Sequence, residues 1–323
     1  MKTFISAVTI ILLSVLLITG NVIGQQPDDK IKIIFDCDLG DDIDDAYALA
    51  LLLSSPEFEV LGLVMDYGNT PERARMALKV LHNTGFDEIP VVIGRKTNDG
   101  FSPQFNWSKG FEMKRLSKLS AVQFFSSIFT KYPNQVILLT TGPVSNMHDL
   151  LSKNPDILKK AKHIYSMFGS FYMGYGKSLQ PSQEWNVKAD LEASKAFVDA
   201  AKNITYVPLD VTTFVKLNEE NRQLLLMRQT PLTNFLSGVY PLWRFMSYAS
   251  KDPVLYDAVT LGIILWPELF TTRSAFVKIA GNGFTVIDES KEPNGQVAIS
   301  INNQEFIKRM MERLLKQNLH FEK

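Results

Sequence analysis

Short apolar, β-branched runs alternate with amphipathic helical patterns from residue 31 onward. Six such runs predict strands, at residues 32–38, 59–66, 90–94, 136–141, 163–168 and 205–209. Six stretches between or after them predict helices, at residues 44–54, 71–83, 121–132, 145–152, 191–201 and 219–227. This alternation is typical of βαβ units. The sequence therefore predicts an open α/β fold with a largely parallel central sheet flanked by helices.

Near the carboxyl terminus the pattern changes to short, closely spaced strands, at residues 275–279, 284–288 and 296–301. Gly-Asn-Gly and Asn-Gly lie between them and favour tight turns between antiparallel strands. We therefore expect a small β-hairpin appendage, followed by an amphipathic helix over residues 304–317. Because no repeat or linker interrupts the chain, we expect one domain over residues 25–323.

The first 24 residues differ from the rest. Lys2 precedes a short apolar run, and small residues stand before the polar segment that begins at Gln25. This arrangement is typical of a secretory signal peptide at residues 1–24. The apolar run is short for a membrane span of about 20 residues, so a retained membrane anchor is the weaker alternative. We expect a secreted or periplasmic protein, in contact with a membrane only if this segment is retained.

The composition limits the binding partners and the disulfide bonds that can be expected. Lys plus Arg and Asp plus Glu number 34 each, so no charge imbalance points to nucleic acid or to an anionic membrane surface. The only cysteine is Cys37, which makes an intrachain disulfide impossible.

Six of the ten residues from Asp36 to Asp45 are aspartates, at the end of the first predicted strand. Carboxylates this close raise one another's pKa values, and a hard cation such as Ca²⁺ or Mg²⁺ would relieve the repulsion. Functional groups of open α/β sheets gather at the carboxyl ends of strands. Polar residues 66–69 and 140–143 also follow strands, so we expect these three segments to converge on one site.

Two known acidic motifs were compared with this segment. An EF-hand is excluded, because the sixth position from Asp36 is Asp41 rather than Gly and the twelfth is Tyr47 rather than Glu. A phosphatase of the haloacid dehalogenase type would use Asp36 and Asp38 as nucleophile and acid. That alternative leaves Asp44 and Asp45 unexplained.

The segment also resembles the signature of the inosine-uridine-preferring nucleoside hydrolase family, in which Asp-x-Asp-x-Gly precedes Asp-Asp-Ala at a helix start. Five further segments resemble that family in the same order, at residues 68–85, 138–146, 184–193, 207–212 and 256–270. The resemblance implies a calcium-dependent N-glycosidase that splits a ribonucleoside, or another N-riboside, into ribose and a free base. It also suggests a homodimer or homotetramer.

The resemblance implies a role for each matching residue. Asp38 would be a metal ligand and the general base for a calcium-bound water. The other calcium ligands would be Asp45, Asp257 and the main-chain carbonyl of Thr141. The ribose hydroxyls would be held by Asp44, Asn69, Asn186 and Glu184, with the 5′-hydroxyl on Glu184.

The chain departs from the family pattern at its proton donor and at two sugar contacts. Tyr256 stands where well-studied members have a histidine, and we hypothesise that its hydroxyl hydrogen-bonds the leaving group. The first motif is two residues longer than the common form, so Asp42 competes with Asp44 for the ribose; we favour Asp44, which directly precedes Asp45-Ala46. Lys177-Ser178 replaces a Gly-Asn pair.

Four aromatic residues could also line the site. Trp185 replaces a common phenylalanine and is expected to line it, because aromatic faces suit a flat base. Trp243, Phe245 and Tyr248 are expected in the core, since their setting is apolar and helical. A riboside- and calcium-binding protein with little turnover is the alternative to an enzyme.

Overall fold

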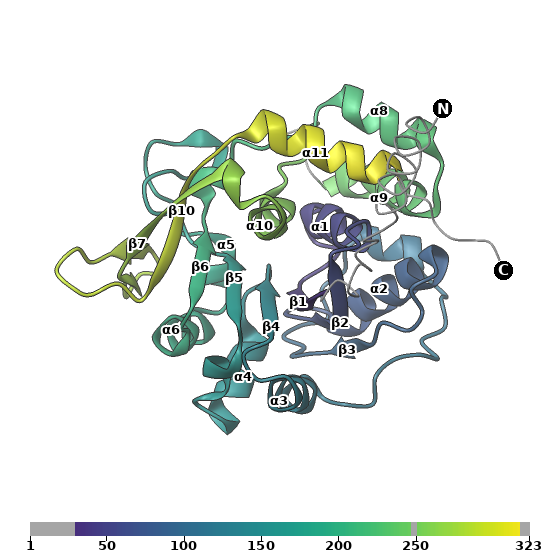
Figure 1. Cartoon of the computed structure of the whole chain (residues 1–323). Coiled ribbons are helices and arrows are strands. Elements are labelled where there is room, and N and C mark those ends of the chain that lie inside the picture. Colours follow the sequence, from purple (N-terminus) through teal and green to yellow (C-terminus); the bar gives the residue numbers. More distant parts are fainter. Residues whose placement is uncertain (1–29, 247–250, 317–323) are drawn as a thin grey trace, which may run out of the picture. The chain divides into compact units, whose positions relative to one another are not determined.

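The computed structural model describes residues 30–246 and 251–316, and its centre is an eight-stranded sheet (Figure 1). The predicted signal peptide lies outside the described residues. The strands are β1 Ile31–Cys37, β2 Phe58–Met65, β3 Val91–Ile93, β4 Val136–Thr140, β5 His163–Met167, β6 Ile204–Val207, β7 Phe270–Ala275 and β10 Gly295–Ile301. Their order is β3-β2-β1-β4-β5-β6-β10-β7, and every pair except β10–β7 is parallel. The six predicted strands and the parallel sheet are confirmed.

The predicted helices are also present, with ends within about two residues of those expected. They are α1 Asp44–Leu53, α2 Thr70–Thr84, α3 Ala121–Lys131, α4 Ser145–Lys153, α6 Leu191–Ala200, α8 Glu219–Arg228 and α11 Asn303–Lys316. Three α-helices had no sequence prediction, namely α5 Trp185–Ala189, α7 Leu209–Thr212 and α10 Tyr256–Leu265. A fourth, α9 Pro231–Met246, was expected only as a helical setting around Trp243 and Phe245, without bounds. Most of α10 is buried, which removes the polar face that helical periodicity requires. No helix among the described residues is long and apolar enough to cross a membrane.

Alternate residues of β1 enter two separate cores, one on each face of the sheet. Ile33 and Phe35 belong to the core under α1, α2, α9, α10 and α11. Ile34 belongs to the core under α3, α4 and α6, and Figure 1 shows these two groups of helices on opposite sides of the strands. Strands of parallel sheets are buried on both faces in this way, which explains their nearly continuous apolar sequence.

The carboxyl-terminal strands differ from the expectation in one respect. β8 Val277–Ile279 and β9 Thr285–Ile287 form the expected antiparallel hairpin. The third predicted strand is not part of that appendage, because β10 pairs with β6 and β7 in the main sheet. Val297 and Ala298 of β10 are fully buried there, so the central sheet gains apolar area that a free hairpin would leave exposed.

The chain order of the strands reverses beside β1. From β1 the chain runs outward through β2 and β3, and it then returns to place β4 on the other side of β1. Open α/β sheets bind ligands outside the carboxyl ends of the strands at such a reversal. The fold therefore directs attention to the residues that follow β1, β4 and β5.

Candidate active site

A cavity of about 530 Å³ lies at this edge of the sheet. Nine of the ten predicted site residues line it, together with several neighbours. The lining comprises Asp38, Asp41, Asp42, Asp44, Asp45, Thr141, Met167, Tyr175, Gln183, Glu184, Trp185, Asn186, Lys188, Tyr256 and Asp257. Segments more than 200 residues apart in the sequence therefore converge on one site.

Two helices present carboxylates to the cavity from their first turns. Asp44 and Asp45 begin α1, and Asp257 is the second residue of α10, which packs against α1. The amino-terminal end of a helix carries partial positive charge and favours carboxylates. Helix direction and helix packing therefore place three negative groups together.

Oxygen atoms of Asp44, Asp45 and Asp257 all lie within 4.8 Å of one another, and all three residues are buried. No lysine or arginine of the described chain forms an ion pair with any of them. Burial raises the pKa of Asp44 and of Asp257 well above the usual range. The charges of Asp42 and Asp45 add to this effect at Asp44, and those of Asp44 and Asp45 add to it at Asp257. Burial also raises the pKa of Asp45 to about 6. Clustered carboxylate oxygens without a direct ion-pair partner suit a hard divalent cation.

Asp38 and Thr141 adjoin this cluster. Asp38 follows β1 and is buried, and burial together with the charge of Asp45 raises its pKa. The Thr141 hydroxyl donates to Asp45 Oδ1 at 2.8 Å. The Thr141 main-chain carbonyl accepts from Asn186 Nδ2, also at 2.8 Å.

Glu184 is fixed by main-chain donors. Its carboxylate accepts from the N–H groups of Asn186 (2.8 Å), Gly169 (3.1 Å) and Val187 (3.2 Å). These bonds favour the charged form, but burial outweighs them and raises the pKa of Glu184 to about 7. The carboxylate also interacts with the hydroxyl of Tyr175, which lines the same cavity, so protein groups hold Glu184 in a fixed position there.

Aromatic side chains form another part of the lining. The ring centroids of Tyr175 and Tyr256 lie 6.1 Å apart, edge to face, and Trp185 stands 6.5 Å from Tyr67 in a similar arrangement. The Tyr175 hydroxyl accepts from the Trp185 main-chain N–H at 2.8 Å. Within the described residues the Tyr256 hydroxyl has no hydrogen-bond partner. Burial raises the pKa of Tyr256, so that hydroxyl stays protonated at neutral pH.

Three other residues considered in the sequence analysis, Asn69, Asp36 and Asp42, differ in their position relative to the cavity. Asn69 is not in the cavity lining, and its Nδ2 is 3.4 Å from the Gly100 carbonyl; its ribose contact stays a prediction. Asp36 lies behind the cavity, where its Oδ1 accepts from Asn146 Nδ2 at 2.7 Å. Asp42 and Asp44 both line the cavity, with Asp44 buried and Asp42 exposed.

Of the three aromatic residues expected in the core, Trp243 is buried there. Phe245 is 78% exposed, so its core placement was wrong: it lies two residues after the buried Trp243, which places it about 200° around α9 from the buried face. Tyr248 lies outside the described residues.

Sequence reasoning missed Arg73 on α2, which is almost completely buried. Its guanidinium donates to the main-chain carbonyls of Asp38 and Leu39 and to that of Tyr67, and it pairs with the Asp41 carboxylate at 2.6 Å. It thereby ties the turn after β1 to the turn after β2. One signal was available: Arg73 lies on the same apolar face of its helix as Met76, Ala77 and Val80.

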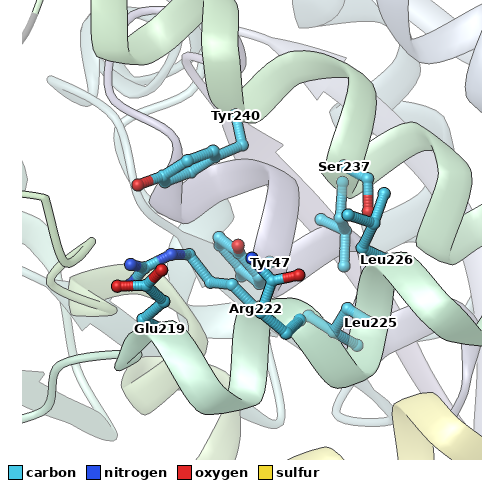
Figure 2. Close-up of a pocket in the computed structure, with 9 residues that line it drawn as sticks. Tyr47, Glu219, Arg222, Leu225, Leu226, Ser237 and Tyr240 are labelled. Carbon is cyan, nitrogen blue, oxygen red and sulfur yellow. The ribbon is translucent and has the colours of Figure 1, made fainter.

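Figure 2 shows a smaller cavity, of about 130 Å³, between α1, α8 and α9. It is lined by Tyr47, Glu219, Arg222, Gln223, Leu225, Leu226, Leu236, Ser237 and Tyr240. The Arg222 guanidinium lies 5.0 Å from the centroid of the Tyr240 ring and pairs with Asp252. None of the predicted site residues lines this cavity.

Comparison with known proteins agrees with this geometry. A pyrimidine-specific ribonucleoside hydrolase, RihA, from Citrobacter koseri is 28% identical over 312 residues, covering 88% of this chain and 98% of that protein. Uridine nucleosidase 1 from Arabidopsis thaliana is 27% identical over 287 residues, covering 83% and 82%.

Solved structures share the fold. A plant nucleoside hydrolase, PpNRh1, superposes with a TM-score of 0.78 at 22% identity, covering 88% of this chain and 99% of that one. A purine-preferring ribonucleoside hydrolase from Gardnerella vaginalis gives 0.76 at 24% identity, covering 88% and 98%.

The sequence profile described as inosine-uridine preferring nucleoside hydrolase matches residues 33–308, which include the whole acidic cluster and Tyr256. The chain therefore belongs to the inosine-uridine preferring nucleoside hydrolase family.

Proposed function

We propose that this protein is an exported, calcium-dependent nucleoside hydrolase that cleaves the N-glycosidic bond of ribonucleosides to ribose and free base. Family membership supports the hydrolysis of nucleosides. The observation that carries the proposal is one cavity that combines a buried carboxylate cluster with a fixed Glu184 and aromatic walls. Export rests on the signal-peptide pattern of residues 1–24.

The donor set fits calcium. The three clustered carboxylates supply only oxygen atoms, which both Ca²⁺ and Mg²⁺ prefer, and the family resemblance favours Ca²⁺. We assign the ion to Asp38, Asp45, Asp257 and the Thr141 main-chain carbonyl. When bound, it would supply Lewis-acid polarisation of the oxygen atoms around it.

The protein's own groups would carry the remaining chemistry. Asp38 accepts a proton from the water that attacks the anomeric carbon. The C–N bond breaks through an oxocarbenium-like state, and the carboxylates beside the sugar stabilise its positive charge. Asp44, with Asn69 and Asn186, binds ribose hydroxyls. Asn186 uses its Nδ2 on the carbonyls of Thr141 and Met167, which leaves its Oδ1 to accept from the sugar.

The departing base would meet the aromatic walls. Trp185 is half exposed at the cavity and offers a face for stacking. The Tyr256 hydroxyl is protonated and unpartnered within the described residues, so it can donate a hydrogen bond to the leaving nitrogen or oxygen. This arrangement would replace the histidine of well-studied relatives.

Ribose release by the mature protein tests the proposal, across purine and pyrimidine ribonucleosides with calcium, with magnesium and with chelator. We expect release that needs calcium. Asp38→Asn should lower kcat at least about 1,000-fold, as loss of a general base does. Asp36→Asn is the matched control, because it makes the same change on the same strand behind the cavity, and it should have a milder effect.

Three other outcomes would count against parts of the proposal. Tight nucleoside binding without ribose release would identify a binding protein. Phosphate release with Mg²⁺, abolished in Asp36→Asn, would identify a phosphatase. Full turnover of Tyr256→Phe on the best substrate would remove the leaving-group role of Tyr256, whereas we expect a loss of about tenfold or more in kcat.

A further inference from the structure

The β8–β9 hairpin contains none of the predicted site residues, yet it contacts the loop that leads to Glu184. The Thr285 hydroxyl of β9 accepts from the Ser170 N–H at 2.8 Å and donates to the Ser170 carbonyl at 2.8 Å. Both bonds are buried, and Thr285 itself is 5% exposed. One side chain therefore satisfies both main-chain groups of one loop residue.

The neighbouring residue connects this contact to the site. Gly169 donates its N–H to Glu184 Oε2 at 3.1 Å and accepts at its carbonyl from the Leu209 N–H. Its φ of +87° requires glycine, and a Cβ there would lie 2.9 Å from two side-chain atoms of Thr285. The hairpin thus packs directly against the segment that holds Glu184.

Ser170 also joins the two ends of the loop. Its hydroxyl donates to the Met173 carbonyl at 2.6 Å and accepts from the Ser182 N–H at 2.8 Å. Asp210 holds the next three N–H groups, those of residues 171–173. Apart from the bond between Gly169 and Glu184 itself, only the contacts of Thr285 and Leu209 among these hold the main chain of residues 169–170.

From this chain of contacts we propose that Thr285 is a positioning residue for Glu184. It fixes residues 169–170 so that the Gly169 N–H holds the Glu184 carboxylate at the angle that accepts the 5′-hydroxyl of a ribonucleoside. This inference rests on the proposed function, because it assigns Glu184 to that hydroxyl. Misplacement of a binding group by about 1 Å can cost orders of magnitude in rate.

The test pairs variants with substrates. Thr285→Val keeps the shape of threonine but removes both hydrogen bonds, whereas Thr285→Ser keeps the hydroxyl. KM and kcat are measured on the best ribonucleoside and on its 5′-deoxy analogue. We expect Thr285→Val to raise KM for the ribonucleoside about tenfold with little change in kcat. KM for the 5′-deoxy analogue should stay within about twofold of the wild-type value. Thr285→Ser should have wild-type values on both substrates.

Thr285→Ala is the second variant, which removes the hydroxyl without crowding Gly169 and must give the same selective loss. Equal losses on both substrates, or no loss on either, would overturn the inference while ribose release still supports the proposed function. If the wild type binds nucleosides without turnover, the same comparison on dissociation constants decides it. No turnover and no binding by the wild type would overturn both.

Discussion

At the scale of single residues, Arg73 is the counter-charge of the acidic site. Its guanidinium donates to three main-chain carbonyls and one carboxylate, and its charge lowers the pKa values of Asp38 and Asp45 against the effect of burial. A planar fork of five donors can make these contacts together, whereas the ammonium of lysine cannot.

We therefore expect Arg73→Lys to lower kcat/KM for ribose release about tenfold or more, which corresponds to about 1.4 kcal/mol of transition-state stabilisation. The turn that carries Asp38 would lose fixed contacts although the charge remains. Arg75→Lys is the control, since it makes the same substitution on the same helix, where the half-buried Arg75 pairs with Glu72 and contacts none of the site residues among those described. Equal effects of the two substitutions would argue against a role for Arg73 in the site.

At the scale of elements, α4 is joined to three strand ends through Asn146. The Asn146 Nδ2 donates to Asp36 Oδ1 at 2.7 Å and to the Met65 carbonyl at 3.1 Å. Its Oδ1 accepts from the Arg95 N–H at 2.8 Å, just after β3. One buried amide thus serves the ends of β1, β2 and β3.

Asn146→Ala would remove the hydrogen bonds to Asp36 Oδ1 and to the Arg95 N–H, whereas the Met65 carbonyl still accepts from the Gly94 N–H. A buried polar group left without a partner costs about 1–3 kcal/mol when water cannot reach it. We expect the free energy of unfolding to fall by about 3 kcal/mol, measured by urea denaturation. Ser152→Ala, on the exposed part of the same helix, should change it by about 0.5 kcal/mol or less. If Asn146→Ala also lowered the free energy of unfolding by only about 0.5 kcal/mol, water or a rearranged side chain would be hydrogen-bonding Asp36 in its place.

Sequence patterns succeeded where local chemistry decides the outcome. β1 and α1 were predictable because an apolar run, a turn and an acidic helix start follow one another within about 20 residues. α10 was not predictable from periodicity, because it is buried nearly all round, and the place of β10 was set by pairing with strands distant in the sequence. The roles of Arg73 and Thr285 depend on contacts to main-chain atoms of remote segments, for which no sequence motif exists.

At the scale of the whole molecule, the buried carboxyls link stability to pH. Burial raises the pKa of Asp45 to about 6 and those of Asp66 and Glu184 to about 7. In an unfolded chain such groups titrate near 4. Between about pH 4 and 7 the folded protein therefore binds more protons than the unfolded chain, and its stability falls as pH rises. Calcium has the opposite dependence, because it binds only carboxylates that have lost their protons.

We expect the chelator-treated protein to have a higher Tm at pH 5 than at pH 8, and the gain in Tm on adding calcium to be larger at pH 8. Between pH 5 and pH 8 a pKa of about 6 in place of about 4 corresponds to about 1.4 kcal/mol for Asp45 alone, and Asp66 and Glu184 add to it, so the shifts should reach several degrees. Thermal unfolding followed by circular dichroism at four pH values, with calcium or with chelator, measures both.

Asp45→Asn should reduce both the pH dependence of Tm and the gain in Tm on adding calcium, because this carboxylate is responsible for part of each. If calcium raised Tm equally at pH 5 and pH 8, the ion would bind away from these carboxylates. If Tm rose with pH in the presence of chelator, these carboxylates would be ionised in the metal-free protein.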